Sequence, residues 1–187
     1  MYNYGLIVGR FQVLHNGHKR MIDTALSICD RVVVYIGSAQ ESGTKRNPFN
    51  FAVRMDMFCR LYSEEITSHR LIIEPLIDIG VGDNALWGAY IMNTFEFHYN
   101  QLPNLYITGN DENRDSWFNS EIAPGVDELI LARDNISATE CRGALEQDDY
   151  VRWCKSVPEV FHKEALFASY SDMYKKCKDK ERNYTRL

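Results

Sequence analysis

Short apolar runs alternate with amphipathic stretches between residues 4 and 132 of the chain. Runs rich in β-branched and aromatic residues predict strands at 4–9, 31–36, 71–77, 104–108 and 128–132. Apolar positions at helical spacing between these runs predict helices at 17–29, 51–62 and about 84–98. Strands that alternate with helices favour a parallel sheet covered on both faces, so the expected fold is a Rossmann-like, doubly wound α/β fold.

The chain beyond residue 136 is predicted to be helical. Two stretches match the capping box of a helix start, Ser137-Ala138-Thr139-Glu140 and Ser156-Val157-Pro158-Glu159. The helix that follows the second box would have one apolar face, made of Leu166, Tyr170, Met173 and Cys177. We therefore expect an α/β domain over residues 1–145 and a small helical part over residues 146–187 that packs on the same domain.

The bulk composition narrows the classes of function. The chain has 187 residues, of which 45% are hydrophobic, and this is enough for one ordinary core. The formal net charge is -5 and no stripe of Lys and Arg crosses the body of the chain, which argues against a nucleic-acid partner. No apolar run is long enough to span a membrane, and no signal peptide is evident. The cysteines form no CxxC pair, so free thiols in a reducing cytoplasm are expected.

The segment Gly9-Arg10-Phe11-Gln12-Val13-Leu14-His15-Asn16-Gly17-His18 joins the first predicted strand to the first predicted helix. The free N–H groups of a helix's first turn attract anions, and the helix dipole adds to that attraction. His15 and His18 add side-chain donors that carry no permanent charge. The pattern predicts a phosphate site, in which both imidazoles could hold a triphosphate and stabilise the charge that develops in a transition state.

Other interpretations of this segment stay open. A zinc ion would need a third and usually a fourth ligand, and no Cys or acidic residue stands close to the two histidines in the sequence. The imidazoles could also be structural groups at a helix start. Gly9-x-Phe11 does not complete the GxGxxG fingerprint of dinucleotide-binding folds, so an NAD-dependent dehydrogenase is not favoured.

A second anion-binding pattern follows the last predicted strand: Ile136-Ser137-Ala138-Thr139-Glu140-Cys141-Arg142. Ser137 and Thr139 place hydroxyls at the start of a helix, and Arg142 follows one turn later. A planar guanidinium can grip two phosphate oxygens at once. The alternative is a plain helix cap with a surface arginine. Because the carboxyl ends of parallel strands share one edge of the sheet, we expect this segment to face the histidine loop.

Together, the two segments resemble the paired signatures of the α/β nucleotidyltransferase superfamily. GRFQVLHNGH is similar to its HxGH signature, and ISATECR is similar to its ISxTxxR signature, in the same order. Further stretches resemble the archaeal-type nicotinamide-mononucleotide adenylyltransferase family: IGSAQ at 36–40 with the following NPF and Arg54, DIGVGDNALW at 78–87, and YITGN at 106–110. The likeness runs from Gly5 to Phe161.

The resemblance implies a site of three parts. The catalytic residues would be His15, His18 and Arg142. The residues at ATP would be Gly9, Arg10, Phe11, Gln12, Gly17, Ile136, Ser137 and Thr139. The residues at the pyridine nucleotide would be Ser38, Asn47, Pro48, Arg54, Asp78, Asn84, Trp87, Gly109 and Asn110. Without the resemblance, Trp87 could be a core residue, Arg54 a solvated helix charge and Asp78 a turn former.

The activity that the resemblance implies is the transfer of AMP from ATP to nicotinamide mononucleotide, which gives NAD and pyrophosphate. Mg²⁺ would be bound by the ATP phosphates, and no metal ligand from the protein is expected. A homo-oligomer is expected by resemblance only. Two alternatives stay open. One is a sister transferase with nicotinic acid mononucleotide, phosphopantetheine or a phosphocholine-like alcohol phosphate as acceptor. The other is a nucleotide-binding regulator that does not turn over.

Overall fold

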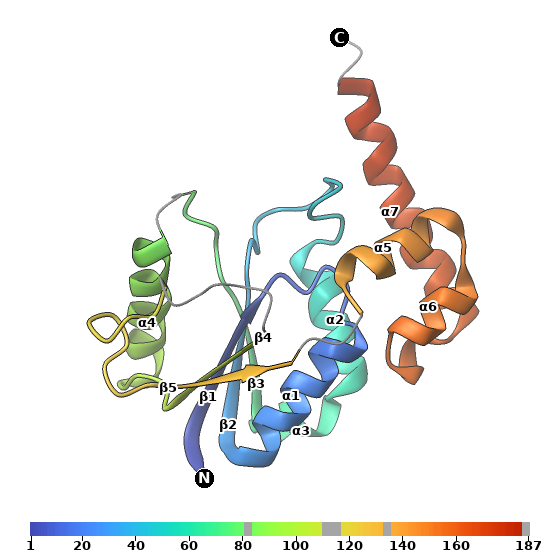
Figure 1. The fold of residues 1–187 in the computed structure, drawn as a ribbon. Coiled ribbons are helices and arrows are strands. Elements are labelled where there is room, and N and C mark those ends of the chain that lie inside the picture. Colours follow the sequence, from blue (N-terminus) through green and yellow to red (C-terminus); the bar gives the residue numbers. More distant parts are fainter. Residues whose placement is uncertain (81–83, 110–116, 133–135, 185–187) are drawn as a thin grey trace.

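The computed structural model describes residues 1–80, 84–109, 117–132 and 136–184. In this part of the chain, five parallel strands form one sheet in the order β3-β2-β1-β4-β5 (Figure 1). The strands are β1 (Tyr2–Gly9), β2 (Cys29–Ile36), β3 (Leu71–Pro75), β4 (Leu105–Gly109) and β5 (Asp127–Leu131). The chain direction across the sheet reverses between β1 and β4, so the switch point of the fold lies where these two strands end.

Helices cover both faces of this sheet. Figure 1 shows α4 on one side, with α1, α2 and the short α3 on the other. Their bounds are α1 (Asn16–Ile28), α2 (Phe51–Leu61), α3 (Ser63–Thr67) and α4 (Asn84–Tyr99). The predicted doubly wound α/β fold is therefore confirmed.

The alternation of side chains along β2 explains the two layers, because successive residues of a strand point to opposite faces. Val32, Val34 and Ile36 belong to a core cluster that includes residues of α1 and α2. Val33 and Tyr35 belong to a second cluster that includes residues of α4. A strand that is apolar on both faces must be covered on both, which is why β2 lies inside the sheet and between two helical layers.

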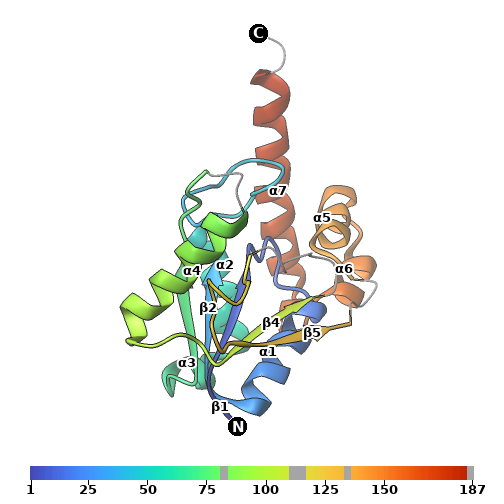
Figure 2. The same ribbon diagram turned by 60° about the vertical axis from the view of Figure 1, so that its left-hand side comes forward.

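The chain after residue 136 is helical, as predicted. Its elements are α5 (Ala138–Gln147), α6 (Tyr150–Ser156), a 3-10 helix η1 (Glu159–Phe161) and α7 (Glu164–Tyr184). Trp153 of α6 is fully buried in the same core cluster as α1 and α2. On α7, Tyr170 and Cys177 are buried, while Leu166 and Met173 pack beside the cluster, which confirms the predicted face. Figure 2 shows α7 continuing beyond the body of the molecule.

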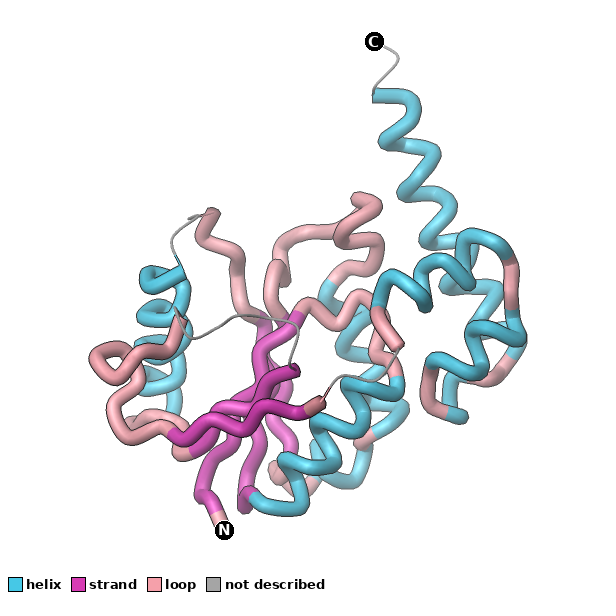
Figure 3. The backbone as a smooth tube through the Cα atoms, viewed as in Figure 1, coloured by secondary structure: helices cyan, strands magenta, loops and turns pink. Residues whose placement is uncertain are grey.

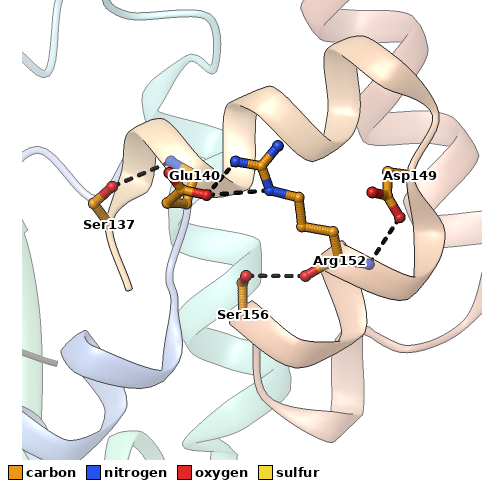
Figure 4. Close-up of polar contacts among 5 residues, drawn as sticks. All are labelled: Ser137, Glu140, Asp149, Arg152 and Ser156. Atoms are coloured by element: carbon orange, nitrogen blue, oxygen red, sulfur yellow. Dashed lines mark hydrogen bonds and ion pairs between the residues drawn. The ribbon is translucent and has the colours of Figure 1, made fainter. Parts of the chain in front are cut away.

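Only the first of the two predicted capping boxes caps a helix. Ser137 precedes α5, and its Oγ accepts the backbone N–H of Glu140 at 3.2 Å (Figure 4). The Glu140 carboxylate lies instead against Arg152 of α6, whose Nε donates to it at 3.1 Å. The second box is wrong. Ser156 is the last residue of α6, its hydroxyl donates to the Arg152 carbonyl at 2.9 Å, and η1 begins after Pro158 without a side-chain cap.

The loops that follow β1, β2 and β3 lie at one edge of the sheet (Figure 3). The backbone N–H of Gly37 donates to the carbonyl of Gly9 at 2.8 Å, which ties the end of β2 to the end of β1. The backbone N–H of Ala39 donates to the carbonyl of Leu76 at 3.0 Å, which ties the same loop to the segment after β3. Residues that are far apart in the sequence therefore share this edge.

The cysteines carry no disulfide, and Cys29, Cys141 and Cys177 are buried. Burial raises the pKa of the Cys141 thiol to about 12, which leaves it in the neutral form of an ordinary core residue. Within the described ranges, no helix is both long and apolar enough to cross a membrane.

Candidate active site

A pocket of about 260 Å³ opens at the switch point of the sheet. Three segments form most of its wall: the loop after β1, the first turn of α1 and the first turn of α5. Thr108 and Gly109 at the end of β4, with Leu131 and Ala132 at the end of β5, also line it. The pocket is lined by every residue that the sequence assigned to catalysis or to ATP, together with Gly109: Gly9, Arg10, Phe11, Gln12, His15, Gly17, His18, Ile136, Ser137, Thr139 and Arg142.

His15 and His18 form a capping box of their own at the start of α1. The Nδ1 of His15 accepts the backbone N–H of His18 at 3.3 Å, and the Nδ1 of His18 accepts the backbone N–H of His15 at 3.4 Å. The rings stack with centroids 3.7 Å apart and planes 21° apart. Because each Nδ1 is an acceptor, each neutral ring carries its proton on Nε2. Each imidazole can therefore act as an N–H donor without carrying charge.

Burial lowers the pKa of His18 well below its usual range, and the neighbouring His15 lowers it further. The Val13 carbonyl opposes this shift. His18 is therefore a neutral donor at physiological pH. Gly17 contributes space for the pair, because a methyl group built on it would lie 3.1 Å from Nδ1 and Cε1 of His15.

Phe11 supports the histidine pair from the core side. Its ring is buried, with its centroid 4.7 Å from that of His18 and 5.0 Å from that of Phe58. Its φ is +49°, a left-handed conformation that is uncommon for a bulky residue. The packed ring compensates for that strain, so Phe11 lines the pocket while it holds the loop in shape.

Arg142 connects the two anion-binding segments. Its Nη1 donates to the carbonyl of Gln12 at 3.1 Å, and its Nη2 donates to Oγ1 of Thr139 at 3.2 Å. Burial lowers the pKa of Arg142. The Arg142 guanidinium therefore reaches from α5 to the histidine loop, as the sequence predicted, and the residue also lines the pocket.

Arg10 lies among other cations. Burial lowers its pKa, and the charges of Arg46 and Arg142 lower it further, while Glu41 and Asp78 oppose them. Guanidinium groups that gather at two helix starts produce a positive potential, which attracts an anion such as a polyphosphate. Arg46 was not singled out in the sequence. The signal that could have found it is its place in the polar loop directly before Asn47-Pro48-Phe49.

Arg54 was expected at the pyridine nucleotide, but it does not lie at the surface of the site. The side chain is fully buried. Its Nη1 donates to the carbonyls of Arg10 at 2.9 Å and Gly37 at 2.8 Å, and its Nη2 donates to the carbonyl of Ser38 at 3.1 Å. Burial lowers its pKa to about 10, so it stays cationic at neutral pH. Because α2 turns this residue inward, its guanidinium joins the loops after β1 and β2 and is not exposed to a ligand.

Gln12 lines the pocket and also holds a neighbouring loop in place. Its side chain forms a two-way pair with the backbone of Phe49, with Nε2 donating to the carbonyl at 3.0 Å and Oε1 accepting the N–H at 2.9 Å. The buried Asn47 donates through Nδ2 to the Glu41 carboxylate, and its Oδ1 has no partner within the described residues. Gln12 thus connects the loop at 47–49, which includes Pro48, to the histidine loop.

Ser38 and Asp78, both expected at the pyridine nucleotide, lie side by side at the same edge of the sheet. Ser38 Oγ donates to Oδ2 of Asp78 at 3.4 Å, and the Gln40 side chain pairs with the Asp78 backbone. Asp78 Oδ1 also accepts the N–H of Gly80 at 3.0 Å, so it forms a turn as well. Asn84 is the first residue of α4, but its side chain, like all of Asn110, lies outside the described residues.

Trp87 stands in the first turn of α4 and is partly buried. Its ring centroid lies 5.5 Å from that of Tyr90 and 6.4 Å from that of Trp117. Trp117 was not singled out in the sequence. Its position in a polar stretch after β4, directly before another aromatic residue, is the only local signal that it offers.

Comparison with known proteins identifies the family of this chain. Residues 6–144 match the model of the cytidylyltransferase-like family. The nicotinamide-nucleotide adenylyltransferase of Thermococcus kodakarensis is 34% identical over 161 residues, which are 84% of this chain and 79% of that protein. The protein of the same name from Pyrococcus abyssi is 36% identical over 139 residues, 74% of this chain and 70% of its own. This chain belongs to the nicotinamide-nucleotide adenylyltransferases of that family.

The predicted class of nucleotidyltransferase is thereby confirmed, and solved structures agree on the fold of the family. A bifunctional NMN adenylyltransferase/ADP ribose pyrophosphatase from Francisella tularensis, complexed with AMP and a Mn ion, superposes with a TM-score of 0.68 at 20% identity. The match covers 100% of this chain and 56% of that one, so the chain spans about half the length of the bifunctional protein. Plasmodium falciparum nicotinic acid mononucleotide adenylyltransferase superposes with a TM-score of 0.58 at 13% identity, over 90% of this chain and 98% of its own.

Proposed function

We propose that this chain transfers the adenylyl group of ATP to the 5'-phosphate of nicotinamide mononucleotide and so produces NAD and pyrophosphate. The observation that carries the proposal is the pocket at the switch point. There, two Nε2–H donors and the guanidinium groups of Arg10 and Arg142 meet the N-termini of α1 and α5. A site with this concentration of donors and no acidic residue in its described lining suits a polyphosphate.

The reaction needs positioning and charge stabilisation more than proton transfer. An oxygen of the acceptor's 5'-phosphate attacks the α-phosphorus of ATP in line, and the bond from that phosphorus to the pyrophosphate oxygen breaks. The phosphate monoester is already ionised at neutral pH, so no general base is required. His18 and His15 would donate to the phosphates in the transition state, with His18 nearest the α-phosphate. Arg10, Ser137, Thr139 and Arg142 would hold the departing pyrophosphate.

Magnesium enters this scheme as part of the substrate, MgATP. The described lining of the pocket contains no carboxylate, and within the described residues no group of His, Cys, Asp and Glu is arranged to hold a metal ion. Magnesium commonly keeps several waters and binds phosphate oxygens, so the ATP phosphates and water would supply its ligands. The protein's own contribution is the set of N–H donors around the same phosphates.

The acceptor would bind on the α4 side of the edge. Ser38, Asn47, Pro48, Asp78, Asn84, Gly109 and Asn110 are proposed to surround the nicotinamide nucleotide, with the Trp87 indole against its ring. A cationic pyridinium gains about 0.5–2 kcal/mol over an indole face. In this scheme Arg54 is not a ligand-binding residue, because its side chain is fully buried and its hydrogen bonds go to backbone carbonyls.

Pyrophosphate release with ATP and a panel of acceptors tests the proposal. Nicotinamide mononucleotide should give pyrophosphate and an equal amount of NAD, while phosphopantetheine should give neither. Nicotinic acid mononucleotide belongs in the panel as the closest chemical competitor. His15→Ala should abolish release, and His69→Ala, which changes an exposed histidine outside the pocket, should not. Tight nucleotide binding with no release for any acceptor would contradict the proposal and favour a regulator.

A further inference from the structure

The helix α7 contacts a loop of the candidate active site, although the family model covers residues 6–144 and α7 lies beyond them. The loop at 47–49 lies beside α7 in both views of the ribbon (Figure 1, Figure 2). The ring of Tyr170 packs edge-on against that of Phe49, with centroids 5.8 Å apart and planes 71° apart. Two turns further along α7, Sγ of Cys177 lies 3.5 Å from the carbonyl oxygen of Pro48.

Phe49 joins this helix to the histidine loop. Its ring contacts Tyr170, while its backbone N–H and carbonyl pair with the Gln12 side chain at 2.9 and 3.0 Å. The backbone carbonyl of Gln12 accepts Nη1 of Arg142 at 3.1 Å. Phe49, Gln12 and Tyr170 are all buried. An unbroken series of contacts therefore runs from α7 through Phe49 and Gln12 to a guanidinium that lines the pocket.

The same helix also holds α5, which carries Arg142. Oγ of Ser171 lies 2.8 Å from the carbonyl oxygen of Leu145, in α5, and 2.8 Å from Oδ1 of Asp148, the residue that ends α5. Arg142 and the loop that supports its partner Gln12 thus both rest on α7. The distance between the two anion-binding segments depends on a helix that is not part of the sheet or of its helical layers.

Ordinary core packing is the alternative explanation for Tyr170, and Phe167 provides the comparison. Phe167 is also a buried ring of α7, and its ring contacts are with Tyr150 and Trp153, both in α6. Tyr170 shares the contact with Trp153, at a centroid distance of 5.9 Å, and adds the contact with Phe49. The two residues therefore differ in the support that they give to the loop.

We propose that Tyr170 is a positioning residue for adenylyl transfer: its ring holds Phe49 so that Gln12 and Arg142 keep their places in the pocket. The inference rests on the proposed function, because it names how the same pocket is kept in its reactive geometry. A displacement of about 1 Å that originates far from the chemistry costs on the order of 10²-fold in rate. A loosened loop therefore slows transfer, while ATP binding, which uses many donors, changes less.

Tyr170→Leu and Phe167→Leu form the matched test, since each removes one buried ring from α7. Tyr170→Leu should lower turnover roughly 10–100-fold, while ATP affinity in a calorimetric titration stays close to that of the wild type. Phe167→Leu should also lower the melting temperature but keep the turnover of the wild type. Phe49→Leu removes the Tyr170 contact from the loop side and should reproduce the loss of turnover. Equal turnover in Tyr170→Leu and Phe167→Leu would overturn the proposal.

Tyr170→Phe separates the ring from its hydroxyl. The hydroxyl is buried and has no hydrogen-bond partner among the described residues. Because the ring contact with Phe49 survives in Tyr170→Phe, this variant should turn over as the wild type does. If Tyr170→Phe were as slow as Tyr170→Leu, the hydroxyl would be the group that matters, and the proposed role of the ring would be refuted.

Amide hydrogen exchange at Phe49 gives a readout that does not depend on activity. The Phe49 N–H is bonded to Oε1 of Gln12 in the interior, so it should exchange slowly in the wild type. Tyr170→Leu should lower the protection of this amide relative to the amides of β1. Phe167→Leu should lower both together, because it affects only overall stability. Unchanged relative protection in Tyr170→Leu would contradict the proposed support of the loop.

A double variant tests the route through Gln12. Gln12→Ala already removes the pair with the Phe49 backbone, so adding Tyr170→Leu should cost little further turnover. Losses that multiply in full would show that Tyr170 acts by another route and would refute the proposal. The two proposals fail separately. A wild type that makes no NAD refutes the proposed function, whereas a wild type that makes NAD while Tyr170→Leu turns over normally refutes only the positioning role.

Discussion

His15 and His18 cap one another: each ring accepts, at its Nδ1, the backbone N–H of the other residue. The pair therefore serves two purposes at once. The Nδ1 atoms cap the start of α1, and Nε2 carries the proton of each neutral ring. The two purposes use different atoms of the same ring, so substitutions can separate them.

His18→Asn should leave the fold intact and remove most of the activity. Asparagine can place an acceptor close to the position of Nδ1, so the cap on the His15 N–H survives, but no donor stands where Nε2–H was. Loss of one preorganised donor to developing phosphate charge costs on the order of 10²–10³ in turnover. Steady-state pyrophosphate release and a thermal melt are the two measurements.

His18→Gln is the complementary variant, because its amide nitrogen can approach the position of Nε2 while the cap is lost. It should retain more turnover than His18→Asn and melt at a lower temperature. The loss of a side-chain cap costs about 1 kcal/mol. The reverse ranking of the two variants in turnover would mean that His18 acts only as a structural cap.

Acid should destabilise the protein through His18. Burial, and to a smaller extent the neighbouring His15, hold the pKa of His18 below its usual range in the folded state. In the unfolded chain the same imidazole takes up a proton at about pH 6.5. The contribution of the neutral ring is therefore fully present above about pH 6.5 and is lost as the pH falls toward the lower folded-state pKa. Urea unfolding at neutral and at mildly acidic pH should show a smaller loss for His18→Asn than for the wild type. Identical losses would exclude His18 as the group responsible.

Arg142→Lys should slow transfer although it keeps the charge. The guanidinium reaches the Gln12 carbonyl and Thr139 Oγ1 together, and a lysine, which is a point charge, cannot reproduce that fork. The measurement is single-turnover transfer from ATP together with ATP affinity. Arg152→Lys, which changes the partner of Glu140 on α6, should behave as the wild type in both. Full activity of Arg142→Lys would show that the mechanism does not need a bidentate contact from a guanidinium.

Arg54→Met should lower the stability of the protein, whereas Arg46→Ala should weaken substrate binding. Removing the buried Arg54 side chain leaves carbonyls of Arg10, Gly37 and Ser38 without their donors, and each buried group left unsatisfied costs about 1–3 kcal/mol. Arg54→Met should therefore lower the free energy of unfolding by several kcal/mol. A stable Arg54→Met that binds nucleotide poorly would restore Arg54 as a ligand-binding residue.

Arg46 is exposed, so Arg46→Ala should leave stability unchanged and weaken the binding of the anionic substrates.

The sequence by itself determined the elements of the sheet and the ATP half of the site. Apolar periodicity located each strand and the helices α1, α2 and α4, because burial on one or two faces imposes that periodicity directly, but the short exposed helix α3 was not predicted. The histidine loop and the segment at Ser137 each run from a strand into a helix start, so short-range connectivity already places their residues at the ligand edge. The residues expected at catalysis and at ATP line one pocket for that reason.

Only the tertiary structure decided what the side chains between these segments do. Arg54 and Gln12 could have faced a ligand or the protein, and the answer depends on loops brought to them by other strands. The same is true of Trp117, which stands beside Trp87 because Gly88 admits its backbone. Such contacts join residues tens of positions apart, and local patterns of polarity do not encode which distant carbonyl or ring will be adjacent. The packing of one loop against another determines that, and it exists only once the sheet has formed.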